Sequence, residues 1–186
     1  MSPTRSHLTF LPVAASIALI VALNLPACKR SPPAPPAPTG RVTAGLTHKL
    51  SPGAPFAQLT STERTVSYTV EGKAAGPDDP KIILVRSSKV YGPDENGRRI
   101  VSETFLSSLP EIKNAANFTT APVSIDGLPG YETTAVAFST KTGTKLRVFC
   151  TALFAADGSY YVVGLAPTGS ELVDTLKAAA ATLQVQ

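Results

Sequence analysis

Four strand-like stretches follow one another in the second half of the chain, and they limit the possible folds more than any other feature. They span residues 118–125, 131–140, 145–155 and 159–166. Over 145–155 every second residue is apolar, as expected for a strand with one buried face: Leu146, Val148, Cys150, Ala152 and Phe154. Asp126-Gly127 and Asp157-Gly158 are tight-turn pairs, and residues 141–144 supply the remaining turn. The pattern predicts an antiparallel meander.

The flanking segments predict two further strands and two helices. Residues 65–70 alternate like a half-buried strand, and 82–85 form the continuous apolar run of a strand buried on both faces. Residues 76–80 and 91–97 have the composition of loops. Residues 99–109 have helical apolar spacing and end at Pro110. A last helix opens after Pro167 and Ser170, with an apolar stripe of Leu172, Val173, Leu176, Ala180 and Leu183.

These elements predict an α+β fold, in which an antiparallel meander sheet of about six strands packs with two helices. The stretch SIDGLPGYETTAVAFSTKTGTKLRVFCTALFAADGSYYVVGLAP, with the helix after it, resembles the C-terminal half of PsbP-like domains. The resemblance covers roughly residues 100–184 and depends on Gly127, Pro129 and Gly130, on the Asp157-Gly158 turn with Tyr160-Tyr161, and on the final helix. The N-terminal half departs from the family, because it has no P-x-x-W strand and the chain has no tryptophan.

The PsbP-like family includes an extrinsic photosystem II subunit, a eukaryotic nuclear-transport cofactor, and small bacterial envelope lipoproteins and secretion chaperones. The resemblance therefore implies an α+β sandwich with a binding or assembly role. The residues on which the resemblance depends are packing and turn residues, so the resemblance identifies no catalytic residue.

The first 27 residues are typical of a secretory leader. Arg5 precedes an uncharged apolar run over 8–23, which is shorter than the ~20 residues of a membrane-spanning helix. Leu25-Pro26-Ala27-Cys28 then resembles the bacterial lipobox, where a leucine three residues before the cysteine and a small residue just before it guide lipoprotein signal peptidase. The resemblance implies that Cys28 is the lipid attachment site and the new N-terminus. Pro26 departs from the motif, and the alternatives are an ordinary cleaved leader or an uncleaved anchor.

Residues 28–55 are predicted to be a lipid-anchored, proline-rich linker and the segment leading into a single α+β domain over 56–186. The five prolines between 32 and 38 fix φ and predict an extended tether. A PxxP ligand for an SH3-type partner is the alternative. We expect a protein of the bacterial cell envelope, lipid-anchored with its domain in the periplasm, and at the outer rather than the inner membrane.

The net charge of +4 does not indicate a nucleic-acid partner. Arg5, Lys29 and Arg30 precede the domain, which leaves 14 of the 17 Lys and Arg against all 13 Asp and Glu from Arg41 onward. A near-neutral domain lacks the electrostatic footprint of nucleic-acid binding.

The residues predict no catalytic, metal or cofactor site. His48, the one histidine after the leader, lies in the lead-in segment, and Cys150 lies on an apolar strand face. Asp94-Glu95-Asn96-Gly97 lacks the ligand spacing of a calcium loop, and Pro129 removes a donor from any phosphate cradle at 127–130. Three tyrosines are predicted to pack rather than to line a groove: Tyr131, Tyr160 and Tyr161.

We expect a non-enzymatic binding or scaffold module that is held at the membrane by its N-terminal lipid and has a protein partner of unknown identity. Two alternatives stay open. One is an enzyme that uses carboxylates, for example Glu103 with Glu111. The other is an immunity-type lipoprotein that neutralises an effector.

Overall fold

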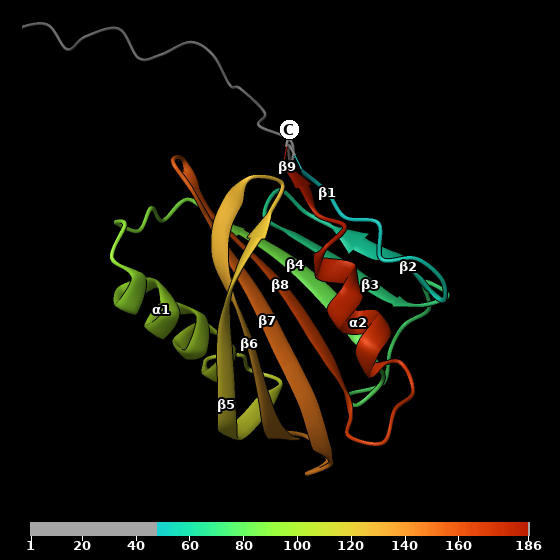
Figure 1. Cartoon of the computed structure of the whole chain (residues 1–186). Coiled ribbons are helices and arrows are strands. Elements are labelled where there is room, and N and C mark those ends of the chain that lie inside the picture. The colour runs from blue at the N-terminus through green and yellow to red at the C-terminus, as the bar shows by residue number, and fades with distance from the viewer. Residues whose placement is uncertain (1–47, 186) are drawn as a thin grey trace, which may run out of the picture. The chain divides into compact units, whose positions relative to one another are not determined.

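The computed structural model describes residues 48–185 (Figure 1). A seven-stranded antiparallel sheet has the order β2-β3-β4-β8-β7-β6-β5, and a separate small sheet pairs β1 with β9. Helix α1 packs on one face of the large sheet and α2 on the other. The elements are β1 His48–Lys49, β2 Phe56–Ser61, β3 Thr65–Val70, β4 Lys81–Ser87, α1 Glu95–Ser107, β5 Ile112–Ile125, β6 Leu128–Ser139, β7 Lys145–Ala155, β8 Gly158–Pro167, α2 Val173–Ala180 and β9 Gln184–Val185.

The predicted α+β fold with an antiparallel meander is confirmed. β5, β6, β7 and β8 are consecutive in sequence and adjacent in the sheet. Asp126 and Gly127 take φ of 51° and 78°, the left-handed pair that a two-residue hairpin turn needs. The large sheet has seven strands instead of about six, because β2 adds an edge strand that the sequence pattern did not predict.

β2 has no alternation that could have revealed it. Phe56 is its one buried residue, and the other five are exposed. Strands β1 and β9 have two residues each and lie at the two ends of the described chain. They pair with each other, His48 with Val185 and Lys49 with Gln184. The adjoining Leu50 is buried in the core, so part of the predicted lead-in segment belongs to the folded body.

β5 begins at Ile112, earlier than the predicted residue 118, because two irregularities interrupt its alternation. Asn114 and Asn117 take φ of 53° and 58°, and the register with β6 shifts across each of them. Such bulges put an unpaired residue into one strand, so alternation along the sequence is lost although the strand continues.

The predicted loop over 91–97 is wrong in its second half, where α1 begins at Glu95. Asp94 caps this helix, because its Oδ2 accepts a hydrogen bond from the Gly97 backbone N–H at 2.8 Å. Glu95 in the first turn also suits the helix dipole. α2 is shorter than predicted and begins at Val173, with no side-chain cap.

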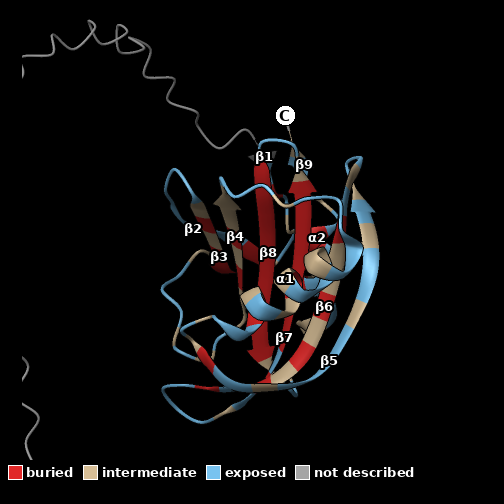
Figure 2. Ribbon diagram, turned by 90° about the vertical axis from the view of Figure 1, so that its left-hand side faces the viewer, coloured by how far each residue is buried: buried red, intermediate tan, exposed pale blue. Residues whose placement is uncertain are grey.

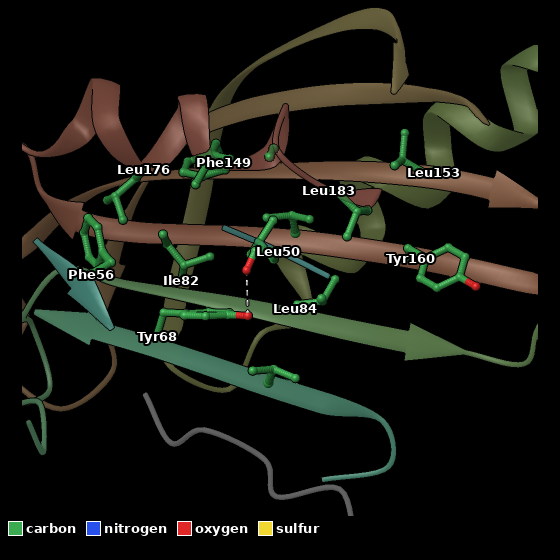
Figure 3. Packing of buried hydrophobic residues seen from close by; sticks show 14 of the residues in the cluster. Leu50, Phe56, Tyr68, Ile82, Leu84, Phe149, Leu153, Tyr160, Leu176 and Leu183 are labelled. Carbon is green, nitrogen blue, oxygen red and sulfur yellow. Dashed lines mark hydrogen bonds between the residues drawn. The ribbon is translucent and has the colours of Figure 1, made fainter. Parts of the chain in front are cut away.

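The core on the α2 face joins β2, β3, β4, β7 and β8 to the helix (Figure 3). The Tyr68 hydroxyl donates to the Leu50 carbonyl at 3.2 Å, which ties the lead-in to β3. Phe149 lies across Gly164 of β8, where any side chain would overlap its ring. Each large apolar side chain buried here contributes about 1.5–3 kcal/mol of transfer free energy.

The core on the α1 face is built around β7 and β8. Phe105 of α1 stacks on Tyr161 with ring centroids 3.8 Å apart and an interplanar angle of 11°. Because helices cover both faces, β7 and β8 are buried almost throughout (Figure 2). β4 also contributes to both cores, as its apolar run predicts, with Ile82 and Leu84 on one face and Ile83 and Val85 toward the other.

Within residues 48–185, neither helix combines the length and the apolar character needed to cross a membrane.

Candidate functional site

The predicted lipid attachment residue Cys28 and the proline-rich linker lie outside the described residues. His48, the one histidine after the predicted leader, lies in β1, where its backbone is opposite Val185.

Cys150 is fully buried beneath α1, as its alternating strand pattern predicts. Burial raises the pKa of this thiol to about 12, and the neighbouring Ser102 hydroxyl offsets only part of that effect. A thiol with this pKa stays protonated at neutral pH and has no access to solvent, so Cys150 acts as a small core residue.

The two glutamates that the enzyme alternative needs lie in different surroundings. Glu103 Oε1 pairs with Arg99 Nη1 at 3.0 Å and accepts a hydrogen bond from Thr120 Oγ1 at 2.9 Å. Glu111 lies beyond the end of α1 and lines a different part of the surface. Among residues 48–185 no contact joins the two, and no three His, Cys, Asp or Glu side chains form a group able to hold a metal ion.

The Glu103 contacts belong to a line of polar groups beneath α1. Thr120 Oγ1 lies 3.2 Å from Thr133 Oγ1, which lies 2.8 Å from Ser102 Oγ. Ser102 and Thr133 are completely buried, so each hydroxyl is the hydrogen-bond partner of the other at a place that water cannot reach. This line fixes how α1 sits on β5 and β6, and it offers no exposed reactive group.

The tyrosines pack, as predicted. Tyr160 and Tyr161 are buried on opposite faces of β8, and Tyr131 packs against the core on the α1 face. Burial raises the pKa of the Tyr161 hydroxyl, which accepts a hydrogen bond from Ser159 Oγ at 3.2 Å. These rings form no open groove.

A hollow of about 220 Å³ lies where the β3–β4 loop, the end of α1 and the β6–β7 turn meet. Its lining residues are Pro77, Lys81, Pro110, Glu111, Ser139, Thr140 and Lys141. Two lysines and one glutamate are among these residues, and no catalytic group accompanies them in the described lining.

Asp78 joins the same loops, a role that the sequence pattern did not reveal. Its Oδ2 accepts hydrogen bonds from Thr142 Oγ1 at 2.6 Å and Thr144 Oγ1 at 2.7 Å. These bonds favour the charged form and lower the pKa of the carboxyl group below its usual value. The adjacent Asp79 is the turn residue expected from its sequence, because its Oδ2 accepts from the Gly76 N–H at 2.7 Å.

An exposed group of side chains lies on the face of the large sheet that α2 covers in part, over β5, β6 and β7. We call it the cationic face, and it consists of Lys113, Val136, Phe138, Lys145 and Arg147. Phe138 is 38% exposed, and the three cations are also exposed. The sequence shows these positive charges only as scattered residues, and the strand register brings them together.

The sequence comparisons identify no relatives. No family model matches the chain, and no curated protein matches it.

Solved structures show a similar fold. LpqN, a protein involved in cell envelope biogenesis of Mycobacterium tuberculosis, is 15% identical, covers 73% of this chain and 78% of its own, and has a TM-score of 0.52. The Ran-binding protein Mog1p of Saccharomyces cerevisiae is 8% identical, covers 75% of this chain and 90% of its own, and has a TM-score of 0.50. At these identities the likeness concerns the fold alone, and the PsbP-like assignment stays a prediction.

Proposed function

We propose that this protein is a lipid-anchored cell-envelope protein whose α+β domain binds a protein partner and catalyses no reaction. The observation that carries the proposal is the lipobox-like Leu25-Pro26-Ala27-Cys28 directly after an apolar leader. Acyl chains on Cys28 would hold the protein at the membrane, since each buried methylene contributes about 0.8 kcal/mol and two or more chains bind firmly. The proline-rich segment that follows would act as a spacer.

Three findings support a binding role. The fold is shared with one protein of cell-envelope biogenesis and with one Ran-binding protein. No described contact joins the two carboxylates of the enzyme alternative: Glu103 pairs with Arg99, and Glu111 lines the hollow beyond the end of α1. The cationic face has an exposed aromatic residue among positive charges. The domain would lie in the periplasm, with the anchor at the outer membrane.

The anchor is tested by metabolic labelling with an alkyne analogue of palmitate in the bacterium that makes the protein. We expect the wild type to be labelled and to fractionate with membranes, and the Cys28→Ala variant to lose the label. Cys150→Ala is the matched control, because it removes the other cysteine and should leave the label in place. Equal labelling of the wild type and Cys28→Ala would refute the lipid anchor.

A further inference from the structure

The strand register places the members of the cationic face in two adjacent rows across three strands. In one row Phe138 of β6 has Lys113 of β5 on one side and Lys145 of β7 on the other. In the next row Val136 lies between Ala116 and Arg147. Residues directly opposite one another share a face of the sheet with Cβ atoms about 4.5–5.5 Å apart, so two apolar side chains are flanked by three cations.

None of these three cations is neutralised within residues 48–185. The ion pairs of the described residues join Lys73 to Glu71, Arg86 to Asp157, Arg99 to Glu103 and Lys177 to Glu132, and none includes Lys113, Lys145 or Arg147. Glu132 lies on the same face, but it is 2.8 Å from Lys177 of α2. Positive charge therefore accumulates around Phe138 without a counter-charge from the domain itself.

Protection of the sheet edge accounts for only one of these cations. Lysines on edge strands block unwanted strand pairing, which explains Lys113 on β5. Lys145 and Arg147 lie on β7, an interior strand with neighbours on both sides, where no edge needs protection. Val136 and Phe138 are likewise on an interior strand, yet Phe138 is 38% exposed. α2 packs over β7 and β8 and leaves this part of the face uncovered (Figure 1).

Addition of a partner strand to the edge is disfavoured. β5 bulges at Asn114 and Asn117, and Pro122 lacks a backbone donor, so its outer edge offers no long regular ladder. A partner is therefore better bound by the side chains of the cationic face than by the backbone at the outer edge of β5.

The cationic face also lies at the far end of the sheet from the point where the described chain begins. Val185 of β9, which pairs with His48, donates its N–H to Asp126 Oδ2 at 2.7 Å, and Asp126 is in the β5–β6 turn. Phe138 is next to the last residue of β6 and follows Leu128 by ten residues, which is about 33 Å along the strand at the usual rise per residue. Figure 1 shows that the two ends of β6 lie at opposite ends of the sheet. The cationic face is therefore remote from the residue at which the described chain begins.

We propose that the cationic face binds an acidic segment of a partner protein, with carboxylates on Lys113, Lys145 and Arg147 and an apolar side chain on Phe138 and Val136. Arg147 suits a bidentate pair with a carboxylate, and a partly exposed aromatic ring among charges is a common anchor of protein interfaces. A membrane surface is a poorer fit, because three cations contribute only about 1 kcal/mol each on anionic lipid. This inference rests on the proposed binding function and names its surface and the chemistry of its partner.

The test uses the full chain in intact cells, with the photo-crosslinking residue p-benzoylphenylalanine at position 138. The same residue at Val90 or Ile100, which are each 53% exposed and lie elsewhere, gives the matched controls. We expect position 138 to capture one protein, and mass spectrometry to place the crosslink in a peptide with an excess of Asp and Glu. In the same background, Lys113→Glu with Arg147→Glu should lower the adduct at least tenfold, and Lys49→Glu should not. Lys113→Gln with Arg147→Gln repeats the test with a milder change, and immunoblots confirm equal amounts of each variant.

The outcomes separate the surface from the function. Three results would overturn the assignment of the cationic face. The adduct could be with phospholipid, it could be with a peptide that lacks acidic residues, or its yield could be unchanged by the charge reversals. Capture of a partner from position 90 or 100 in place of 138 would overturn the assignment too, while the binding function would stand. Absence of any adduct from all three positions would refute both.

Discussion

Gly164 is the position where the packing of this fold can be tested most directly. A Cβ atom added there would lie 1.7 Å from Cε1 and 2.2 Å from Cζ of Phe149, whereas carbon atoms in contact lie about 3.5–4.0 Å apart. Phe149 is buried between β8 and the α2 core, so its ring has little room to move. Gly164→Ala should therefore destabilise the protein strongly.

The expected cost follows from two opposing effects. Overpacking of a well-filled core costs about 1–3 kcal/mol, and the direct overlap with a ring places this site at the upper end, about 3 kcal/mol. Alanine restores roughly 0.5 kcal/mol of backbone entropy, which leaves about 2.5 kcal/mol. That is a large part of the 5–15 kcal/mol typical of a domain.

A double-mutant cycle identifies the cause of this cost. Phe149→Leu alone should cost about 1.5 kcal/mol, because it removes ring atoms from the core. Combined with Gly164→Ala it should cost about 2 kcal/mol, well below the 4 kcal/mol of additive effects, because the smaller side chain makes room for the new methyl group. Gly92→Ala is the control, since its Cβ would meet nothing within 4 Å.

The assay is urea unfolding of the mature protein, followed by far-UV circular dichroism in the presence of a reductant. The midpoints convert to free energies of unfolding only if the slope m is the same for all variants. A cost below 1 kcal/mol for Gly164→Ala, or additive costs in the cycle, would refute the described packing of Phe149 on β8.

Two further predictions follow from the buried thiol and from Asp78. Cys150 should react with a thiol reagent such as DTNB only after denaturation, because it is fully buried and its pKa is raised to about 12, and rapid reaction of the native protein would contradict this burial. The lowered pKa of Asp78 means that its charged form stabilises the folded state above the unfolded-state pKa, and that this contribution is lost as the pH falls through the folded-state value. As the pH falls below the unfolded-state pKa, Asp78→Asn should thus lose less stability in urea titrations than the wild type. Parallel pH profiles of the two proteins would show that the bonds of Asp78 to Thr142 and Thr144 do not stabilise its charged form.

The interior strands could be predicted from the sequence because their periodicity is local. β7 spans the predicted residues 145–155, since one of its faces carries an unbroken alternation of apolar side chains. The Asp126-Gly127 turn was equally predictable, because a left-handed residue pair is encoded by the two residues themselves. Cys150 belongs with these successes, since its burial follows from its place in that alternation.

The elements that escaped prediction depend on partners distant in the sequence. β2 is an exposed edge strand, and β1 and β9 exist only because the two ends of the domain meet. The start of α1 could not be predicted because Gly97, a residue typical of loops, lies within its first turn. In the structure the Gly97 N–H donates to Asp94 Oδ2, and this bond caps the helix.

By itself the sequence determined the α+β class and the order of the central strands, because turns and periodicity are encoded by neighbouring residues. The lipobox-like leader stays a prediction. Only the tertiary structure decided which charged and polar side chains meet. Asp78 reaches Thr142 across two loops, and Lys113, Phe138, Lys145 and Arg147 share one face through the register of three strands. Register depends on hydrogen bonds between distant segments and on which face each strand buries, and a shift of one residue would turn every one of these side chains to the other face.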